Sequence, residues 1–230
     1  LGAVLYTGVC RESYEPATAC RVAAELGVRE NAFIYDISNA CLGVMNGILD
    51  LANRIELGQI QAGMVVSCES SREINELIIE QMLAQPTMEF FTKSLATLTG
   101  GSGAVAVIVK HKDFAPSDQP DHQLLGGVSC AQPQFHELCK WGVKKDPELA
   151  EYMFTDSVAV LNNGVELGRR TWLSLLEEMQ WAPGDVHKAI CHQVGSAHIN
   201  TIMKTIDMDA SQQFPSFAFL GNICTASLPL

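Results

Sequence analysis

The sequence predicts an α/β fold built from layers of helices and strands. Along its 230 residues, short apolar runs with the character of buried strands alternate with segments of helical periodicity, a pattern typical of α/β layers. The segment 41–57 carries two apolar stripes at helical spacing, so its helix is expected to be buried on two faces. With 47% hydrophobic residues, a chain of this length has enough apolar surface for a large core.

The first part of the chain is expected to alternate between strands and helices. The expected strands are 1–9 (LGAVLYTGV), 31–38 (NAFIYDIS), 62–70 (AGMVVSCES) and 101–110 (GSGAVAVIVK), and the expected helices are 16–27, 41–57 and 73–83. Pro16 and Gly27 bound the first helix, because proline is tolerated in a first helical turn and glycine ends helices. The two stripes of the helix 41–57 are Leu42, Met45, Leu49 and Ala52, and Val44, Ile48, Leu51 and Ile55.

The remaining residues continue the alternation after a polar linker. In order, they are the linker 111–121 (HKDFAPSDQPD), a strand at 122–131, a long helix at 157–181, a strand at 187–193 (HKAICHQ), a helix at 196–206 and a helical start in 222–230. The segments NACLG (39–43) and NICTA (222–226) both lie where a loop is expected to enter a helix. This similarity is consistent with two related halves.

Charge and composition limit the classes of partner. A net charge of -11 without a Lys/Arg stripe argues against nucleic acid, although a phosphate-bearing cofactor could bind a local basic patch. The longest apolar run, 103–109, is far shorter than the roughly 20 residues of a membrane span. The start at Leu1 lacks a signal-peptide pattern and resembles the interior of a longer chain. Eight cysteines without a disulfide framework indicate a reducing, cytoplasmic compartment.

Four side chains at the edges of expected elements are candidates for chemistry. Cys41 begins a helix, where unpaired N–H groups and the helix dipole lower a thiol pKa, but cysteine is also among the most buried residue types. His192 ends a strand and could donate to an anion or relay a proton, or be structural. Asn222 could donate to an oxyanion or cap a helix. Glu15, held extended by Pro16, could be a solvated loop carboxylate.

A cysteine, a histidine and an asparagine at element edges resemble the nucleophile, base and orienting group of acyl-transfer enzymes. Three alternatives stay open on these residues. A papain-like hydrolase has the same order of residues, but its CGSCW-type signature is missing. A zinc site could form from Cys130, His136 and Cys139, although no CxxC pair is present. A non-catalytic scaffold would need only the apolar elements.

Three segments together resemble the thiolase superfamily, specifically its ketosynthase III branch, which includes β-ketoacyl-acyl-carrier-protein synthase III. DISNACLG (36–43) is similar to the family's nucleophile segment, CHQVGSAH (191–198) to its HQAN histidine segment, and LGNICTASLPL (220–230) to its YGNTSSASIP asparagine segment. A glycine-rich turn of the family is matched by Gly101, Ser102 and Gly103. The segments occur in the family's order, and the resemblance covers essentially the whole chain.

The resemblance implies a five-layer αβαβα fold of two related halves, with the helix 41–57 between two sheets. The N-terminal half would be residues 1–130, with the nucleophile Cys41. The C-terminal half would be residues 131–230, with His192 and Asn222. The resemblance also implies that the chain is incomplete at both ends, lacking the beginning of the fold and the last glycine-rich loop, which gives a backbone N–H to the acyl oxyanion hole.

The resemblance assigns a role to each candidate residue. Cys41 would be acylated, while His192 and Asn222 would hold the carbonyl oxygen of a second thioester. The segment VCRESYEPATA (9–19) is similar to one in olefin-biosynthesis enzymes that join two fatty acyl-CoAs head to head. There, a glutamate at the position of Glu15 serves as base in the neighbouring subunit's active site. Two unactivated acyl chains need such a base to remove the α-proton, so the resemblance implies a non-decarboxylative Claisen condensation by a homodimeric acyltransferase.

The implied substrates are coenzyme A thioesters, with no permanently bound cofactor and no metal. HQVGSAH stands where carrier-protein-dependent synthases have HQANxRI, so the arginine expected near the carrier-protein surface is replaced around Ala197 and His198. This favours acyl-CoA over an acyl carrier protein as donor. The alternative is a decarboxylative β-ketoacyl-acyl-carrier-protein synthase III of fatty-acid biosynthesis, which would condense acyl-CoA with malonyl-acyl carrier protein.

Overall fold

The computed structural model describes residues 1–11, 13–114, 122–145 and 149–230. These residues form two compact units. The first comprises Leu1–Ser70, Ser102–Leu125 and Ile223–Leu230, and the second comprises Ser71–Gly101 and Gly126–Asn222. Most of the expected linker, residues 115–121, lies outside the described residues, and the division into two halves at residue 130 stays a prediction.

The first unit is built on a four-stranded mixed sheet. Its strands are β1 (Ala3–Thr7), β2 (Phe33–Ile37), β3 (Ala62–Ser70) and β4 (Ser102–Lys110), in the order β2-β1-β3-β4. β1 runs parallel to β2 and β3, and β4 runs antiparallel to β3. All four strands were expected. β1 is buried along its whole length, as an unbroken apolar run predicts for a strand covered on both faces.

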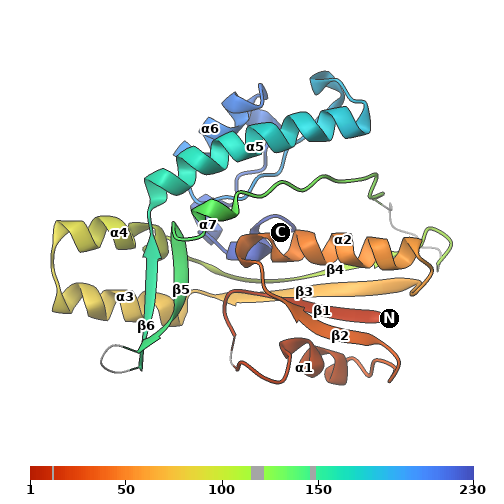
Figure 1. Ribbon diagram of the computed structural model, residues 1–230, viewed down its shortest axis with the longest axis horizontal. Helices are drawn as coiled ribbons and strands as arrows, with labels where there is room; N and C mark the ends of the chain where they lie inside the picture. The colour runs from red at the N-terminus through yellow and green to blue at the C-terminus, as the bar shows by residue number, and fades with distance from the viewer. Residues whose placement is uncertain (12, 115–121, 146–148) are drawn as a thin grey trace. The chain divides into compact units, whose positions relative to one another are not determined.

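One helix covers each face of this sheet (Figure 1). The helices are α1 (Thr18–Glu25) and α2 (Gly43–Glu56), both at expected positions. Val4 of β1 lies in a buried cluster with Ala23 of α1, whereas the next residue, Leu5, lies in a cluster with Leu51 of α2. Successive strand side chains point to opposite faces, so β1 alone anchors both helices.

Only one of the two apolar stripes of α2 is buried. Val44, Leu51 and Ile55 are buried in the core on the sheet, whereas Leu42 and Met45 of the other stripe are 46% and 37% exposed. The expectation of a helix buried on both faces is therefore wrong for this structure. The buried apolar cluster that includes α2 residues lies on the side of the sheet β2-β1-β3-β4, and Leu42 and Met45 do not belong to it.

Gly43 sets how closely α2 approaches β1. A Cβ atom at Gly43 would lie 1.6 Å from Thr7 Oγ1 and 2.9 Å from Thr7 Cβ, far inside van der Waals contact. We expect Gly43→Ala to lower the free energy of unfolding by more than about 3 kcal/mol, because neither backbone can retreat without opening the core. Urea denaturation followed by circular dichroism measures this loss.

A matched control for this substitution is Gly164→Ala, within the helix α5 (Ser157–Met179). An added Cβ there meets no atom within 4 Å, so the same chemical change should raise stability by roughly 0.5–1 kcal/mol through helix propensity. Similar changes in the free energy of unfolding for Gly43→Ala and Gly164→Ala would show that Thr7 does not exclude a larger side chain at position 43.

The described part of the second unit is mainly helical. Its elements are α3 (Arg72–Ala84), α4 (Met88–Leu98), β5 (Cys139–Lys145), β6 (Leu149–Thr155), α5 (Ser157–Met179), α6 (Ser196–Thr205) and α7 (Phe217–Leu220). The helices expected at 73–83, 157–181 and 196–206 are confirmed as α3, α5 and α6. α4 was not expected, although Thr87 caps it by accepting the N–H of Phe90 at 3.2 Å. The hairpin of β5 and β6 was also not expected; it packs against α3 and α4.

Two strands expected in the second half of the chain are wrong. Residues 122–131 and 187–193 have no strand structure. A strand needs a hydrogen-bonded neighbour, and neither segment pairs with one within the described residues. In the second segment, Ala189 and Cys191 pack instead beside α6, against a cluster that includes Met203, whereas Ile190 is exposed. The helical start expected in 222–230 is a 3₁₀ turn.

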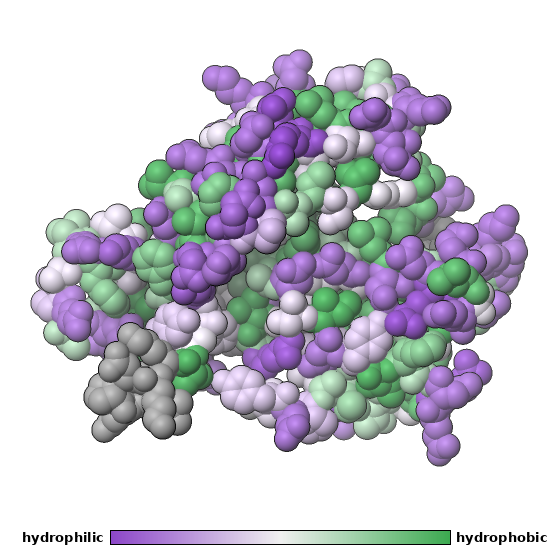
Figure 2. All heavy atoms as spheres, in the orientation of Figure 1, coloured by the Kyte–Doolittle hydropathy of each residue, from purple (hydrophilic) through white to green (hydrophobic). Residues whose placement is uncertain are grey.

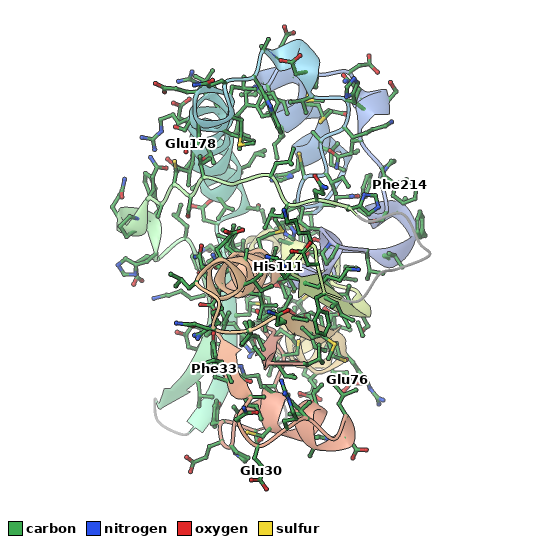
Figure 3. The ribbon with its side chains drawn as sticks, turned by 90° about the vertical axis from the view of Figure 1, so that its right-hand side faces the viewer. Glu30, Phe33, Glu76, His111, Glu178 and Phe214 are labelled. Atoms are coloured by element: carbon green, nitrogen blue, oxygen red, sulfur yellow. The ribbon has the colours of Figure 1, made fainter. Side chains whose placement is uncertain are left out.

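The outer surface is rich in acidic side chains. Glu30, Glu76 and Glu178 point away from the ribbon (Figure 3), and hydrophilic and apolar side chains are intermixed over the face drawn in Figure 2. Among the described helices, none combines the length and apolarity needed to cross a membrane.

Candidate active site

Cys41 lies where the chain passes from β2 into α2. It is the middle residue of a 3₁₀ turn, η1 (Ala40–Leu42), directly before the first residue of α2. The preceding Ala40 has a φ of 44°, a left-handed conformation that is costly for a residue with a side chain and that is found disproportionately at functional sites. Cys41 itself is half-buried. Its thiol is therefore fixed by a strained turn and still open to a small molecule.

Cys224 is a side-chain hydrogen-bond partner of Cys41. It opens the 3₁₀ turn η5 (Cys224–Ser227) and has a φ of 49°. The N–H of Val44 donates to Thr225 Oγ1 at 2.8 Å, which holds the two turns together and satisfies a donor that the start of α2 would otherwise leave unpaired. The hydrogen bond with Cys41, and then burial, raise the pKa of Cys224. Cys224 therefore keeps its proton and donates it towards the sulfur of Cys41.

A buried carboxylate, Glu69 at the end of β3, interacts electrostatically with Cys41 and Cys224. It is 2% exposed, and its oxygens accept the N–H of Val9 at 3.0 and 3.1 Å and that of Cys10 at 3.1 Å. Burial raises the pKa of Glu69, hydrogen bonds from Val9 and Cys10 lower it, and the charge of Cys41 raises it further. Glu69 was not expected as a site residue, although a glutamate inside an apolar strand is itself a signal, because glutamate is rarely buried.

Glu15 lies on the loop between β1 and α1, and its side chain is exposed. Two carboxylates anchor the ends of this loop. Glu69 holds the first end, and Asp36 of β2 holds the second by accepting the N–H groups of Thr18 and Ala19, each at 2.9 Å. These are the first donors of α1, which have no partner within the helix. The loop therefore presents Glu15 to the surroundings from two fixed ends.

Tyr6 lies near Glu69 in the first unit and makes the stability of the fold depend on pH. Its hydroxyl donates to the carbonyl oxygens of Cys10 and Cys68 at 3.1 and 2.9 Å. Burial, with the charge of Glu69 as the next cause, raises the pKa of Tyr6 from 10.0 to about 12. The unfolded chain releases this proton near pH 10 and the folded chain near pH 12. The stabilisation is thus complete below pH 10 and lost as pH rises through that window.

We expect wild-type protein to lose about 3 kcal/mol more stability between pH 10 and pH 12 than Tyr6→Phe loses, which is the free-energy equivalent of two pKa units. Urea denaturation at a series of fixed pH values measures both. Because the comparison is of slopes, any constant cost of losing the hydroxyl cancels. Parallel curves would show that Tyr6 titrates alike in the folded and unfolded states.

Asn222 lies in the second unit and is tied to the glycine turn at Gly100 and Gly101. Its N–H donates to the carbonyl of Thr99 at 2.9 Å, and its carbonyl accepts the N–H of Gly101 at 2.9 Å. The preceding Gly221 has a φ of 69°, and an added Cβ there would lie 2.7 Å from the Thr99 oxygen. Glycine at position 221 tolerates the positive φ and, having no Cβ, lets the Thr99 oxygen come this close. The backbone of Asn222 is therefore fixed.

His192 lies in an irregular segment of the second unit, next to a fixed neighbour. Gln193 is 2% exposed; its amide donates to the carbonyl of Phe214 at 2.8 Å and accepts the N–H groups of Ser216 and Phe217 at 2.7 and 3.1 Å. These side-chain hydrogen bonds of Gln193 hold the backbone next to His192, which no strand pairing within the described residues holds. Burial, and then the nearby His192, lower the pKa of His198.

The structure places the four candidate residues in two units. Cys41 and Glu15 belong to the first unit, and His192 and Asn222 to the second. Within the first unit, Cys41 is hydrogen-bonded to Cys224 and interacts electrostatically with Glu69. Among the described residues, no group of three or more His, Cys, Asp or Glu side chains could hold a metal ion, so the alternative zinc site has no support. The roles of the four residues stay predictions.

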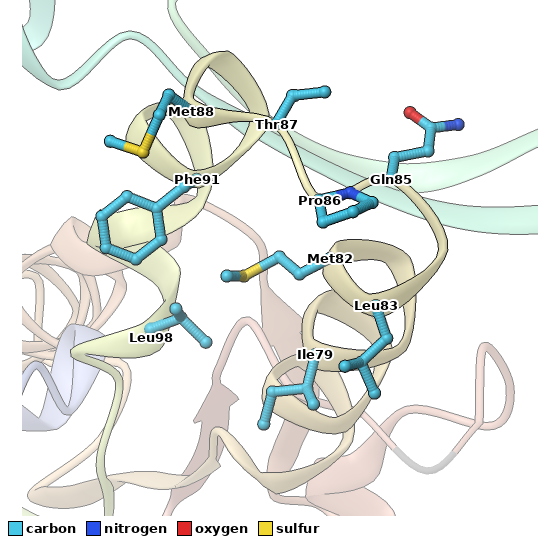
Figure 4. A pocket seen from close by; sticks show the side chains of 9 residues that line it. All are labelled: Ile79, Met82, Leu83, Gln85, Pro86, Thr87, Met88, Phe91 and Leu98. Carbon is cyan, nitrogen blue, oxygen red and sulfur yellow. The ribbon is translucent and has the colours of Figure 1, made fainter.

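A separate apolar pocket of about 360 Å³ lies between α3 and α4. Figure 4 shows its lining, in which Met82 and Phe91 approach from the two helices. The lining residues are Ile79, Met82, Leu83, Gln85, Pro86, Thr87, Met88, Phe91 and Leu98. None of these is titratable, so the pocket offers room for an apolar group and no acid, base or nucleophile.

Comparison with known proteins gives the chain close relatives. No protein-family model matches it. It is 53% identical over 232 residues to the acyl-CoA:acyl-CoA alkyltransferase of Shewanella oneidensis, a match that covers 100% of this chain and 66% of the relative. The enzyme of the same name from Xanthomonas campestris is 30% identical, with 100% and 65% covered. A β-ketoacyl-[acyl-carrier-protein] synthase III of Pseudomonas aeruginosa is 24% identical, with 94% and 61% covered.

Solved structures agree with these sequence relationships. A crystal structure of a cysteine-to-alanine variant of Xanthomonas campestris OleA matches with a TM-score of 0.88 at 30% identity, covering 100% of this chain and 64% of that one. A structure of a cysteine-to-serine variant of the same protein, with bound lauric acid and lauroyl-CoA, matches with a TM-score of 0.85 at 30% identity, covering 100% and 65%. The expected thiolase-like α/β fold is confirmed by this likeness.

The chain spans about two thirds of the length of the curated relatives, 66% and 65% for the two alkyltransferases. The match extends over every residue of this chain, including the three segments around Cys41, His192 and Asn222 that first indicated the family. The chain belongs to the thiolase-fold family that contains the acyl-CoA:acyl-CoA alkyltransferases and, more distantly, the β-ketoacyl-[acyl-carrier-protein] synthases III.

Proposed function

We propose that this protein is an acyltransferase that joins two fatty acyl-CoAs by a non-decarboxylative Claisen condensation through an acyl-Cys41 intermediate. The observation that carries the proposal is the environment of Cys41, whose thiol lies at the start of α2 and is hydrogen-bonded to the protonated Cys224. A donor and a helix N-terminus both stabilise a thiolate, the form that attacks thioesters. The 53% identity to an acyl-CoA:acyl-CoA alkyltransferase supports the same chemistry.

The first half-reaction is acyl transfer to Cys41. The thiolate attacks the carbonyl carbon of an acyl-CoA and forms a C–S bond, and the bond to the coenzyme A sulfur breaks. Coenzyme A leaves as a thiolate and takes a proton from solvent. The lauroyl-CoA bound to OleA supports acyl-CoA as donor.

The second half-reaction forms the carbon–carbon bond. Glu15 removes the α-proton of a second acyl-CoA, while His192 and Asn222 donate hydrogen bonds to its carbonyl oxygen as negative charge develops there. The carbanion attacks the carbonyl of acyl-Cys41, the new C–C bond forms, and the C–S bond to Cys41 breaks to return the thiolate. The product is a β-ketoacyl-CoA, which hydrolysis converts to a β-keto acid.

Glu15 acts in the partner subunit of a homodimer in this proposal. Its exposed position on a loop anchored at both ends by Glu69 and Asp36 supports an outward-reaching role. A loop held at both ends can place a carboxylate in a neighbouring site at low entropic cost. The reaction needs no resident cofactor or metal, and we place it in the lipid metabolism of the cytoplasm.

A product assay tests the reaction class. Full-length protein is incubated with myristoyl-CoA, with and without malonyl thioester, and the products are analysed by mass spectrometry. We expect a β-keto product from two myristoyl chains without malonyl thioester. The second candidate, supported by the 24% identity to β-ketoacyl-[acyl-carrier-protein] synthase III, is decarboxylative extension; a strict requirement for malonyl thioester would establish it in place of our proposal.

A further inference from the structure

The side chains of two cysteines meet in the first unit, and the proposed condensation uses only one of them. Cys41 and Cys224 are hydrogen-bonded to each other although 182 residues separate them in the sequence. Both are half-buried rather than sealed in the core. The pair therefore offers chemistry that a single nucleophile does not.

Two turns of the backbone hold the two thiols next to each other. Cys41 lies in η1, two residues before the start of α2, and Cys224 opens η5. The hydrogen bond from the Val44 N–H to Thr225 Oγ1, at 2.8 Å, locks these turns together just beyond the two cysteines. A disulfide needs the two Cβ atoms within about 4.5 Å of each other. The cysteine side chain is short, so two cysteines whose sulfur atoms share a hydrogen bond have Cβ atoms close to this separation.

We propose that Cys41 and Cys224 form a reversible intramolecular disulfide when the protein meets hydrogen peroxide. The Cys41 thiolate attacks one peroxide oxygen, the O–O bond breaks, and Cys41 becomes a sulfenic acid while hydroxide leaves and takes a proton from solvent to become water. The Cys224 sulfur then attacks the Cys41 sulfur, the S–S bond forms, the S–O bond breaks, and water leaves with the Cys224 proton. Two thiols have together lost two electrons, and one peroxide has become two waters.

The neighbouring groups favour Cys224 over other cysteines as the resolving thiol. Cys10 lies in the same corner, but its thiol donates to the carbonyl of Ser70 at 2.9 Å. Cys20 and Cys68 are exposed on α1 and β3, outside the turns that carry the pair. The protonated state of Cys224, set by its hydrogen bond with Cys41 and by burial, leaves Cys41 as the sulfur that reacts first with peroxide.

The disulfide would protect Cys41 from further oxidation and, at the same time, stop acyl transfer. A cysteine sulfenic acid without a neighbouring thiol is oxidised further to sulfinic acid, which dithiol reductants do not reverse. Capture by Cys224 ends that sequence at a reducible state. The loss of acyl transfer rests on the proposed function, because it assumes that Cys41 is the residue that becomes acylated. Formation of the disulfide does not depend on that function.

Peptide mapping by mass spectrometry tests the modification directly. Full-length wild type, Cys224→Ser and Cys10→Ser are treated with hydrogen peroxide, alkylated and digested without reduction. We expect wild type and Cys10→Ser to lose about 2 Da and to yield a Cys41–Cys224 cross-linked peptide. In Cys224→Ser, a sulfenic-acid probe should label Cys41, and sulfinic acid should accumulate there. A wild-type disulfide between any other cysteines, or none, would overturn the proposal.

Recovery after reduction provides the second measurement. Each protein is treated with peroxide and then dithiothreitol, and its acylation by myristoyl-CoA is compared with that of its own untreated sample. The recovered fraction should be at least about five-fold lower for Cys224→Ser than for wild type, and equal fractions would overturn the protective role. A protein that forms the disulfide but never acylates Cys41 would refute the proposed function and leave the disulfide standing.

Discussion

Cys41→Ala is expected to abolish the acyl adduct and to lower condensation by at least about 10⁴-fold, because removal of a covalent nucleophile eliminates the two-step route. Full-length protein is incubated with myristoyl-CoA and its intact mass is measured. Wild type should gain one myristoyl group. Folding should be little affected, since alanine fits the space of cysteine in a half-buried turn.

Cys20→Ala is the matched control for this substitution. Cys20 is an exposed cysteine in α1, so the same chemical change there should leave both the adduct and the rate of condensation unchanged. An acyl adduct that survives in Cys41→Ala, or an unmodified wild type, would remove Cys41 from the mechanism.

Glu15→Ala is expected to separate the two half-reactions. Acylation of Cys41 should persist, because Glu15 takes no part in it, whereas condensation should fall by at least roughly 100-fold, the usual effect of losing a general base. Glu30→Ala, at an exposed glutamate elsewhere in the first unit, is the matched control and should leave condensation unchanged. Unchanged condensation in Glu15→Ala would exclude it as the base.

Mixing two inactive variants shows whether Glu15 acts across a dimer. If subunits of Cys41→Ala and Glu15→Ala exchange freely in equal amounts, half of the dimers are mixed, and each mixed dimer has one site with both residues intact. Condensation should then return to about one quarter of the wild-type rate for a two-fold symmetric dimer. A mixture as inactive as its components, with exchange verified, would place Glu15 in the site of its own chain.

The elements around Cys41 could be predicted because local sequence determines them. The strands β1 to β4 and the helix α2 follow from continuous apolar runs, helical periodicity and glycine or proline boundaries. The second half was harder. The run HKAICHQ has a strand's composition, but no described strand pairs with it, and its Ala189 and Cys191 pack beside α6. Periodicity reports which side chains prefer burial and carries no information about the partner that buries them.

The candidate site was predictable in part for a similar reason. Cys41, His192 and Asn222 stand in short segments that carry a family signature, so each could be named from the sequence. Glu69 and Cys224 interact with Cys41 only across long sequence separations, Glu69 through its charge and Cys224 through a side-chain hydrogen bond. No local pattern records such contacts. The structure thus adds to the nucleophile a protonated thiol donor and a buried carboxylate that anchors the loop of Glu15.

The fate of labelled carbonyl carbons tests the central claim most directly. Myristoyl-CoA labelled with carbon-13 at the thioester carbonyl is given to the full-length protein, and the β-keto product is analysed by mass spectrometry. Joining two acyl chains without decarboxylation predicts label at both the ketone and the carboxyl carbon, with no malonyl thioester present. A product that forms only after malonyl thioester is added, and that carries label at the ketone alone, would contradict the account.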